Sequence, residues 1–303
     1  MKTAQAGILQ PVPSQGRYLF FSLHEPAALR GALARLAGLV DGETVVAALG
    51  QITVTALDAS VPGLREMPNL SGPGVAVPTT PMALWCWLRG SDRGDLVILT
   101  HQLEKALAPA CHLDRAVDAF RHGQGPNGQG RDLTGYEDGT ENPKDEAAET
   151  AALVQGAGAG LDGGSFVAVQ QWLHDFDAFE ALAPDGQDNA VGRRRSDNEE
   201  LVDAPQSAHV KRTAQESFVP EAFVLRRSMP WAMSNKAGLM FVAFGCSFDA
   251  FEAQMRRMAG LEADGITDAI FGFSKPVNGA YFWCPPVRPG ARGARLDLRS
   301  LGL

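Results

Sequence analysis

Two stretches far apart in the chain carry the same order of elements, and this repetition limits the fold more than any other feature. Residues 19–39 (LFFSLHEPAALRGALARLAGL) and 241–261 (FVAFGCSFDAFEAQMRRMAGL) each read as a buried strand followed by an amphipathic helix ending in Ala-Gly-Leu. In the second half, FVA at 166–168 with DAFEA at 177–181 recurs at 241–243 and 249–253. Repeated strand–helix units are typical of a ferredoxin-like βαββαβ arrangement, although chance similarity between two amphipathic helices is an alternative.

We therefore predict an α+β protein with two ferredoxin-like domains whose antiparallel sheets pack side by side. The 303 residues are enough for two domains of ordinary size. A loop rich in Gly, Asn and Gln at 122–131 predicts a boundary near residue 130, with an N-terminal domain over 1–130 and a C-terminal domain over 131–288. Residues 289–303 are expected to form a flexible tail, or to pack on their own domain.

Charge and cysteine spacing exclude several classes of protein. The 27 Lys and Arg residues against 35 Asp and Glu give a net charge of −8, which disfavours a general nucleic-acid or anionic-membrane binder. The cysteines Cys86, Cys111, Cys246 and Cys284 fit neither a zinc spacing nor a CxxC pair, so we expect reduced thiols. No long apolar run is present, and we expect a soluble, cytoplasmic protein that binds neither nucleic acid nor membrane.

Residues 135–143 (GYEDGTENP) are the centre of the possible chemistry. Asp138 lies among turn-forming glycines, which leave little bulk around its carboxylate, so a flat ligand could approach closely. Taken alone, the stretch is more typical of a solvated Asp-Gly turn. A calcium loop is a third alternative, because Asp138, Thr140, Asn142 and Asp145 place oxygens at near-alternate positions, without the glycine and final Glu that an EF-hand requires.

Two further residues have side chains suited to redox chemistry. His209, in SAHVKRT, could be an axial haem ligand if a neighbouring acceptor orients its ring. Arg226, in VLRRSMP, follows a strand-like apolar run, and its permanent charge could stabilise negative charge on a breaking O–O bond. Taken singly, His209 is more typical of an ordinary histidine, and Arg226 is more typical of a salt bridge at the end of a strand.

The combination of segments resembles a known family. GYEDGTENP carries the GxxDG motif of the dye-decolourising (DyP-type) haem peroxidases, and its TENP extension is similar to the bacterial intracellular B-type group. The resemblance runs in order from residues 10–11 through GYEDGTENP, GRRRSDNEEL at 192–201, the His209 and Arg226 segments, and residues 273–286. It covers nearly the whole chain, and it implies a fold of the dimeric α+β barrel type.

The resemblance implies a role for each of several residues. It makes His209 the proximal ligand of the iron in haem b (iron protoporphyrin IX), Asp138 and Arg226 the distal acid–base pair, and Ser228 a small polar distal residue. Asp268 would accept the N–H of the proximal imidazole, with Glu221 as a competing acid. The other cofactor-binding residues would be Arg193 at a propionate, Leu239 and Phe241 over the distal side, and Gly139 and Thr140 beside the haem.

The activity implied by the resemblance is reduction of hydrogen peroxide with one-electron oxidation of organic donors such as dyes or phenols, through an oxyferryl intermediate. Tyr136, Trp231, Tyr281 and Trp283 are candidates for electron entry at the surface, with core packing as the alternative. We also expect a homo-oligomer, and residues 298–303 (LRSLGL) resemble peptides that dock inside a protein shell. Two other functions stay open: a haem-binding or haem-delivery protein with incidental peroxidase activity, and a dimerisation module with a calcium-stabilised loop.

Overall fold

The computed structural model describes residues 3–290 and 293–303, and its N-terminal half is a complete βαββαβ unit. Its strands are antiparallel in the order β2-β3-β1-β4, which is the ferredoxin-like order. The elements are α1 (Ala6–Leu9), β1 (Gln15–Leu23), η1 (Pro26–Ala28), α2 (Leu29–Ala37), β2 (Val45–Leu49), α3 (Gln51–Ala56), β3 (Leu84–Gly90), α4 (Arg93–Leu107) and β4 (Cys111–Phe120).

The C-terminal half repeats this plan with more helices in its first crossover. Its strands follow the equivalent antiparallel order β9-β5-β8-β7, and β6 pairs with the far end of β8. The elements are α5 (Asp145–Ala152), β5 (Ser165–His174), α6 (Phe176–Glu180), α7 (Pro184–Val191), α8 (His209–Arg212), η2 (Gln215–Ser217), β6 (Leu225–Arg226), β7 (Met229–Met233), β8 (Lys236–Gly245), α9 (Asp249–Met258), η3 (Ala269–Gly272) and β9 (Ser274–Cys284).

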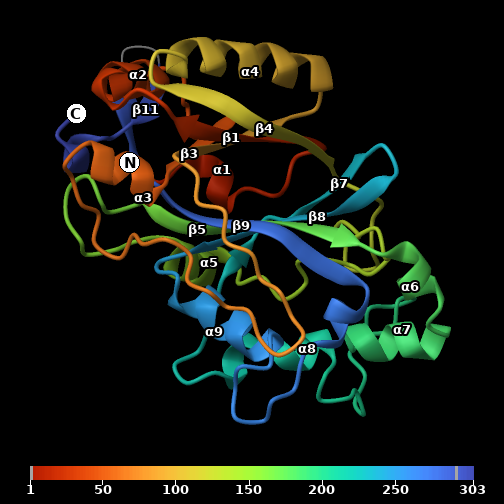
Figure 1. Ribbon diagram of the computed structural model, residues 1–303. Coiled ribbons are helices and arrows are strands. Elements are labelled where there is room, and N and C mark those ends of the chain that lie inside the picture. The colour runs from red at the N-terminus through yellow and green to blue at the C-terminus, as the bar shows by residue number, and fades with distance from the viewer. Residues whose placement is uncertain (1–2, 291–292) are drawn as a thin grey trace.

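The two sheets join edge to edge and close on themselves. β2 meets β9 at Leu49 and Trp283, and β4 meets β7 at Ala119 and Trp231, with a single registered pair at each seam. These seams make one nine-stranded sheet, and pairing of β5 with β8 closes it into a barrel. The predicted α+β fold with two antiparallel sheets side by side is therefore confirmed (Figure 1).

Alternate side chains of each strand divide between two apolar regions. Trp85 and Trp87 of the first half meet Phe244 and Phe282 of the second half inside the barrel, and Tyr18 stacks on the two tryptophans. On the outer face, α2 and α4 cover the N-terminal strands, and α8 and α9 lie over the C-terminal strands (Figure 1). The barrel interior is therefore a core that the two halves share.

The C-terminal segment is folded onto the rest of the chain. β10 (Val287–Gly290) pairs with β11 (Gly293–Leu296), and η4 (Arg299–Leu301) follows. Leu296, Leu298 and Leu301 are buried in the core beneath the N-terminal helices. Where the sequence predicts a flexible tail, the structure places packed leucines, because burying three apolar side chains outweighs the disorder that the Pro, Gly and Arg content favours.

Candidate active site

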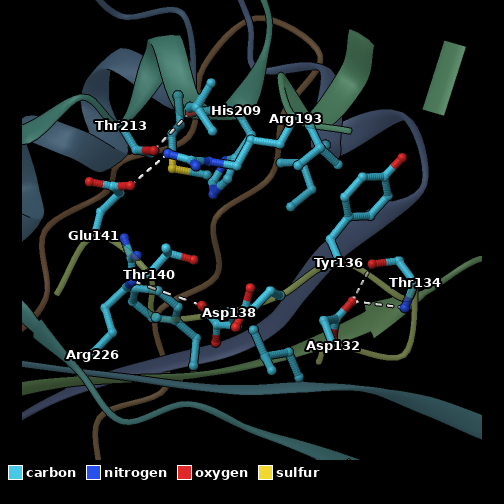
Figure 2. Close-up of a pocket in the computed structure, with 18 of the residues that line it drawn as sticks. Asp132, Thr134, Tyr136, Asp138, Thr140, Glu141, Arg193, His209, Thr213 and Arg226 are labelled. Atoms are coloured by element: carbon cyan, nitrogen blue, oxygen red, sulfur yellow. Dashed lines mark hydrogen bonds and ion pairs between the residues drawn. The ribbon is translucent and has the colours of Figure 1, made fainter. Parts of the chain in front are cut away.

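A large cavity lies on the outer face of the C-terminal sheet, under the helices that follow β5. Its volume is about 1410 Å³, including the part that opens to solvent. Trp172 of β5, Leu239 and Phe241 of β8, and Met255 of α9 form apolar walls. The loop that carries Asp138 and the helix that begins at His209 supply the polar groups, which Figure 2 shows on facing sides of the cavity.

The loop over residues 130–141 turns tightly enough to point Asp138 into the cavity. Gly135 and Gly139 have φ values of +91° and +88°, a left-handed conformation that strains residues with a side chain. The N–H of Asp138 donates to the carbonyl of Gly130 at 3.0 Å, which fixes the backbone that carries the carboxylate. The sequence therefore needs glycine at both ends of the turn for a geometric reason.

Asp138 and Arg226 form a loose ion pair inside the cavity. The distance from Arg226 Nε to Asp138 Oδ1 is 4.0 Å, and the two side chains are 14% and 31% exposed, respectively. Burial raises the pKa of Asp138, and the positive charge of Arg226 opposes that rise. Arg226 Nε is buried and has no hydrogen-bond partner within the described part of the chain. A cation with an unused donor therefore lies beside a carboxylate whose proton affinity is increased.

His209 faces this pair from the other side of the cavity (Figure 2). Its Nδ1–H donates to Asp268 Oδ2 at 2.8 Å, and the Asp268 side chain is fully buried. Asp268 Oδ1 accepts the N–H of Ile270 at 2.9 Å, so the carboxylate is itself held in place. These bonds orient the imidazole and leave its Nε2 without a hydrogen-bond partner within residues 3–290 and 293–303. Glu221 is exposed and does not hold the ring.

A charged cluster lies at the edge of the cavity. Arg193 Nη2 donates to Glu141 at 2.6 Å and lies 3.5 Å from Glu200, while Arg193 Nη1 donates to the carbonyl of Asn198 at 2.9 Å. Asn198 Nδ2 in turn donates to Thr140 Oγ1 at 3.0 Å. These bonds tie the loop with the three consecutive arginines to the loop that carries Asp138.

Comparison with known protein families places this cavity in context. The family described as "Dyp-type peroxidase, C-terminal" matches residues 129–289, which is more than half of the chain and contains both walls of the cavity. The chain belongs to the Dyp-type peroxidase family. It is accordingly a peroxidase.

Known Dyp-type peroxidases resemble the chain over most of its length. A dye-decolorizing peroxidase of Mycolicibacterium paratuberculosis is 28% identical over 306 residues, covering 92% of this chain and 85% of the relative. A Dyp-type peroxidase structure from Shewanella oneidensis has a TM-score of 0.87 at 25% identity, covering 94% of this chain and 97% of the other. A variant of Rhodococcus jostii RHA1 DypB in complex with heme has a TM-score of 0.81 at 25% identity, covering 93% and 96%.

Most of the Dyp-type site residues expected from the sequence lie around the cavity. The lining includes Asp138, Gly139, Thr140, Arg193, His209, Arg226, Leu239 and Phe241. Asp268 lies behind His209 and does not line the cavity. Ser228 lines an adjoining hollow that also contacts Asp138 and Arg226, and its Oγ accepts the N–H of Val242 at 3.3 Å. Within the described residues, no group of three or more His, Cys, Asp or Glu side chains could hold a metal ion.

Several residues that shape this cavity were not found from the sequence. Asn142 brackets the backbone of Arg226, and Glu137 accepts the N–H groups of Asn127 and Gln129 at 3.1 and 2.8 Å, which anchors the loop before Asp138. The sequence signal for both was their place inside GYEDGTENP, but the partners of Asn142 lie 84 positions away. Glu137 thus anchors the loop through backbone N–H groups.

The aromatic residues considered for electron entry at the surface are all in the interior. Tyr136, Trp231, Tyr281 and Trp283 are buried. Tyr136 Oη donates to Asp188 at 2.5 Å, and Trp231 Nε1 donates to the carbonyl of Trp172 at 2.9 Å. The contacts of Tyr136 and Trp231 match the alternative of core packing with one hydrogen-bonded polar atom, whereas Trp283 Nε1 is buried without a partner among the described residues.

Proposed function

We propose that this peroxidase works with haem b bound through His209. The observation that carries the proposal is the imidazole of His209, which Asp268 holds by Nδ1 while Nε2 stays open towards a cavity with apolar walls. This is the arrangement expected of an axial ligand whose second nitrogen is fixed by a carboxylate. Bound haem would supply the iron at which peroxide is reduced and through which donors lose single electrons.

Asp138 and Arg226 are proposed to carry out the proton and charge work on peroxide. Asp138 would accept a proton from one oxygen of the peroxide and return it to the other, directly or through a water. Arg226 has an unused Nε–H, which would stabilise the negative charge that develops on the departing oxygen. Ser228, at the edge of the adjoining hollow, would add a small hydroxyl near the same two side chains.

The remaining predicted residues are proposed to bind the cofactor. Arg193 would pair with a propionate in exchange for its present bond to Glu141. Leu239 and Phe241 would pack on the distal face of the ring, since both belong to one face of β8 and both line the cavity. Gly139 and Thr140 would lie beside the ring edge, where the turn keeps the backbone close.

Hydrogen peroxide and an organic donor, such as a dye or a phenol, are the proposed substrates. The division at residue 130 and a homo-oligomeric state also stay predictions.

A Dyp-type peroxidase from Mycobacterium smegmatis is described as encapsulated. Here Leu298 and Leu301 are buried, so docking by the tail would first have to release them. We therefore propose that residues 289–303 mainly stabilise this chain, and deleting them without loss of any partner protein would support that role. Within the described residues, no helix is long and apolar enough to cross a membrane.

An absorption spectrum tests the proposed cofactor and ligand together. The protein loaded with haemin should show a Soret band that His209→Ala shifts or removes, and a spectrum unchanged by this substitution would refute His209 as the ligand. A haem-delivery protein would need the ligand but not the distal pair. If Asp138→Ala with Arg226→Ala leaves the stopped-flow reaction with peroxide unchanged while haem binding persists, delivery is favoured over catalysis.

A further inference from the structure

A buried hydrogen-bonded chain of three side chains separates the cavity from a second hollow. Ser274 Oγ lies 2.7 Å from His174 Nδ1, and His174 Nε2 lies 3.0 Å from Asp132 Oδ1. The side chains of His174 and Asp132 are 5% and 15% exposed, and Ser274 is 3% exposed. A serine, a histidine and an aspartate thus form one continuous line of polar atoms inside the protein.

All three side chains border the cavity, but only the Ser274 end of the line also reaches an outer hollow. His174 and Ser274 line both the cavity and an outer hollow of about 1030 Å³, which Lys236, Lys275, Asp175 and Asp177 also border. Asp132, at the inner end, lines the cavity and the adjoining hollow, and Asp138 lines the same two spaces. The chain therefore begins at the outer hollow and ends on the wall that carries Asp138.

The carboxylate at the inner end is ionised and fixed. Burial acts to raise the pKa of Asp132, but hydrogen bonds from His174 and Thr134 outweigh it and lower the pKa. Thr134 donates to Asp132 Oδ2 through its N–H at 3.0 Å and its hydroxyl at 2.6 Å (Figure 2). His174 therefore directs its Nε2–H to Asp132, and its Nδ1 accepts the hydroxyl proton of Ser274.

We propose that Ser274, His174 and Asp132 form a proton path from the outer hollow to the distal side of the cavity. The need for it rests on the proposed function, because reducing hydrogen peroxide to two waters consumes two protons and two electrons. The electrons come from the donor, and the path supplies protons at the wall of the cavity that carries Asp138.

One passage moves one proton inward without moving electrons. The Ser274 O–H bond breaks as an N–H bond forms at His174 Nδ1, and an acid in the outer hollow, hydronium or a buffer acid, returns a proton to Ser274 Oγ. The Nε2–H bond of His174 breaks as an O–H bond forms at Asp132, which releases the proton to solvent in the cavity beside Asp138. His174 then presents a lone pair to an ionised carboxylate. This is unfavourable, so the ring turns over and again directs an N–H to Asp132.

A purely structural role makes a different prediction from a proton path. If His174 only anchored the loop before Asp138, any side chain that donates to Asp132 would serve. His174→Gln keeps such a donor but passes protons poorly, and Ser274→Ala keeps the bond between His174 and Asp132 while removing the outer link. Ser165→Ala is the matched control, because Ser165 is a buried serine on β5 away from the path, bonded only to the carbonyl of Phe166 among the described residues.

The first measurement uses the haem-free protein and so does not depend on the cofactor. NMR of the ¹⁵N-labelled protein should show the His174 N–H exchanging with water, and Ser274→Ala should slow this exchange about tenfold or more, since a proton relay typically contributes that much or more. Ser165→Ala should leave the exchange unchanged. Exchange in Ser274→Ala as fast as in the wild type would overturn the path.

The second measurement uses the haem-loaded enzyme. His174→Gln should slow the reaction with peroxide about tenfold or more while its Soret band and thermal unfolding stay as in the wild type, and imidazole buffer should restore the rate in proportion to its concentration. A wild-type rate in His174→Gln, or a slow rate that no imidazole concentration raises, would overturn the path. A wild-type protein without a Soret band would instead sink the proposed function, and the exchange measurement would still decide on the path.

Discussion

Asn142 holds both backbone groups of Arg226. The N–H of Arg226 donates to Asn142 Oδ1 at 2.7 Å, and Asn142 Nδ2 donates to the carbonyl of Arg226 at 3.0 Å. Asn142 belongs to the loop that carries Asp138, whereas Arg226 ends the short strand β6. One amide side chain therefore sets the position of the proposed distal cation relative to the proposed distal base.

Replacing Asn142 should uncouple this pair. Asn142→Ala leaves the N–H of Arg226 without its side-chain acceptor, while Arg227 Nη1 still donates to the carbonyl of Arg226. Losing the partner of this partly buried N–H should lower the free energy of unfolding by about 1–3 kcal/mol. The misplaced Arg226 should slow the reaction with peroxide by up to about 100-fold, because small displacements of catalytic groups are costly. Stopped-flow absorbance and urea unfolding measure the two effects. Asn69→Ala, which loses one hydrogen bond in a surface turn, is the control and should change neither.

Removing the negative charge of Asp268, which lies behind His209, should weaken haem binding or turnover. Asp268→Asn keeps the size of the side chain but loses the carboxylate that accepts Nδ1–H, so haem affinity or turnover should fall about tenfold to 100-fold. Haem titration followed by the Soret band measures the affinity. Asp297→Asn changes another buried aspartate, in the C-terminal segment, and should leave the affinity intact. Equal effects from the two variants would contradict a specific role for Asp268.

The pH dependence should follow the raised pKa of Asp138. Asp138 can act as a base only when ionised, so the peroxide reaction should slow as pH falls through a pKa above that of an ordinary aspartate. Arg226→Leu removes the opposing positive charge and should move this limb to higher pH. A pH–rate profile that keeps the same midpoint in Arg226→Leu would show that another group controls it.

The same raised pKa predicts the sign of a stability change. The folded haem-free protein binds the Asp138 proton more tightly than the unfolded chain, so its stability should decrease as pH rises from the ordinary aspartate pKa through the raised one. Asp138→Asn removes this penalty and should be more stable than the wild type at neutral pH. Urea unfolding over a pH series measures the difference, which should vanish in acid where both carboxyl groups are protonated.

Arg193 and Glu141 pair at the edge of the cavity, and substituting one or the other should have opposite effects on haem binding. Arg193→Ala should raise the Kd for haem about tenfold or more, the cost of losing one charge-assisted hydrogen bond to a propionate. Glu141→Gln frees Arg193 from its 2.6 Å partner and should leave the Kd unchanged or lower it. Arg194→Ala serves as the control, because Arg194 pairs with Asp197 and Glu199 away from the cavity. A Kd unaffected by Arg193→Ala would refute its assignment to a propionate.

The strands and helices that depend on the local spacing of apolar residues were predicted from the sequence. The strand and helix at 19–39 and their echo at 241–261 became β1 with α2 and β8 with α9, since strands and helices of this length are determined by the spacing of apolar residues. β7 was not predicted because it contains Pro230, which is tolerated where the strand meets β4 at a single pair.

The site was predictable only in part, for a reason of distance along the chain. Asp138, His209 and Arg226 were found because each lies in a motif that resembles the family. Asn142 with Arg226, and His174 with both Asp132 and Ser274, were not found because these bonds join positions 84, 42 and 100 residues apart. No periodicity or spacing rule relates such positions, so only the folded chain brings them together.

The seams of the barrel limit which substitutions each half can accept independently of the other. With one registered backbone pair at each seam, the halves adhere mainly through the aromatic side chains that meet inside, such as Trp85 of one half against Phe282 of the other. A substitution in that interior changes the packing of both halves. Substitutions inside the C-terminal half, which carries the cavity, therefore require compatible side chains in the N-terminal half. Through this shared packing, the N-terminal half maintains the shape of the C-terminal sheet.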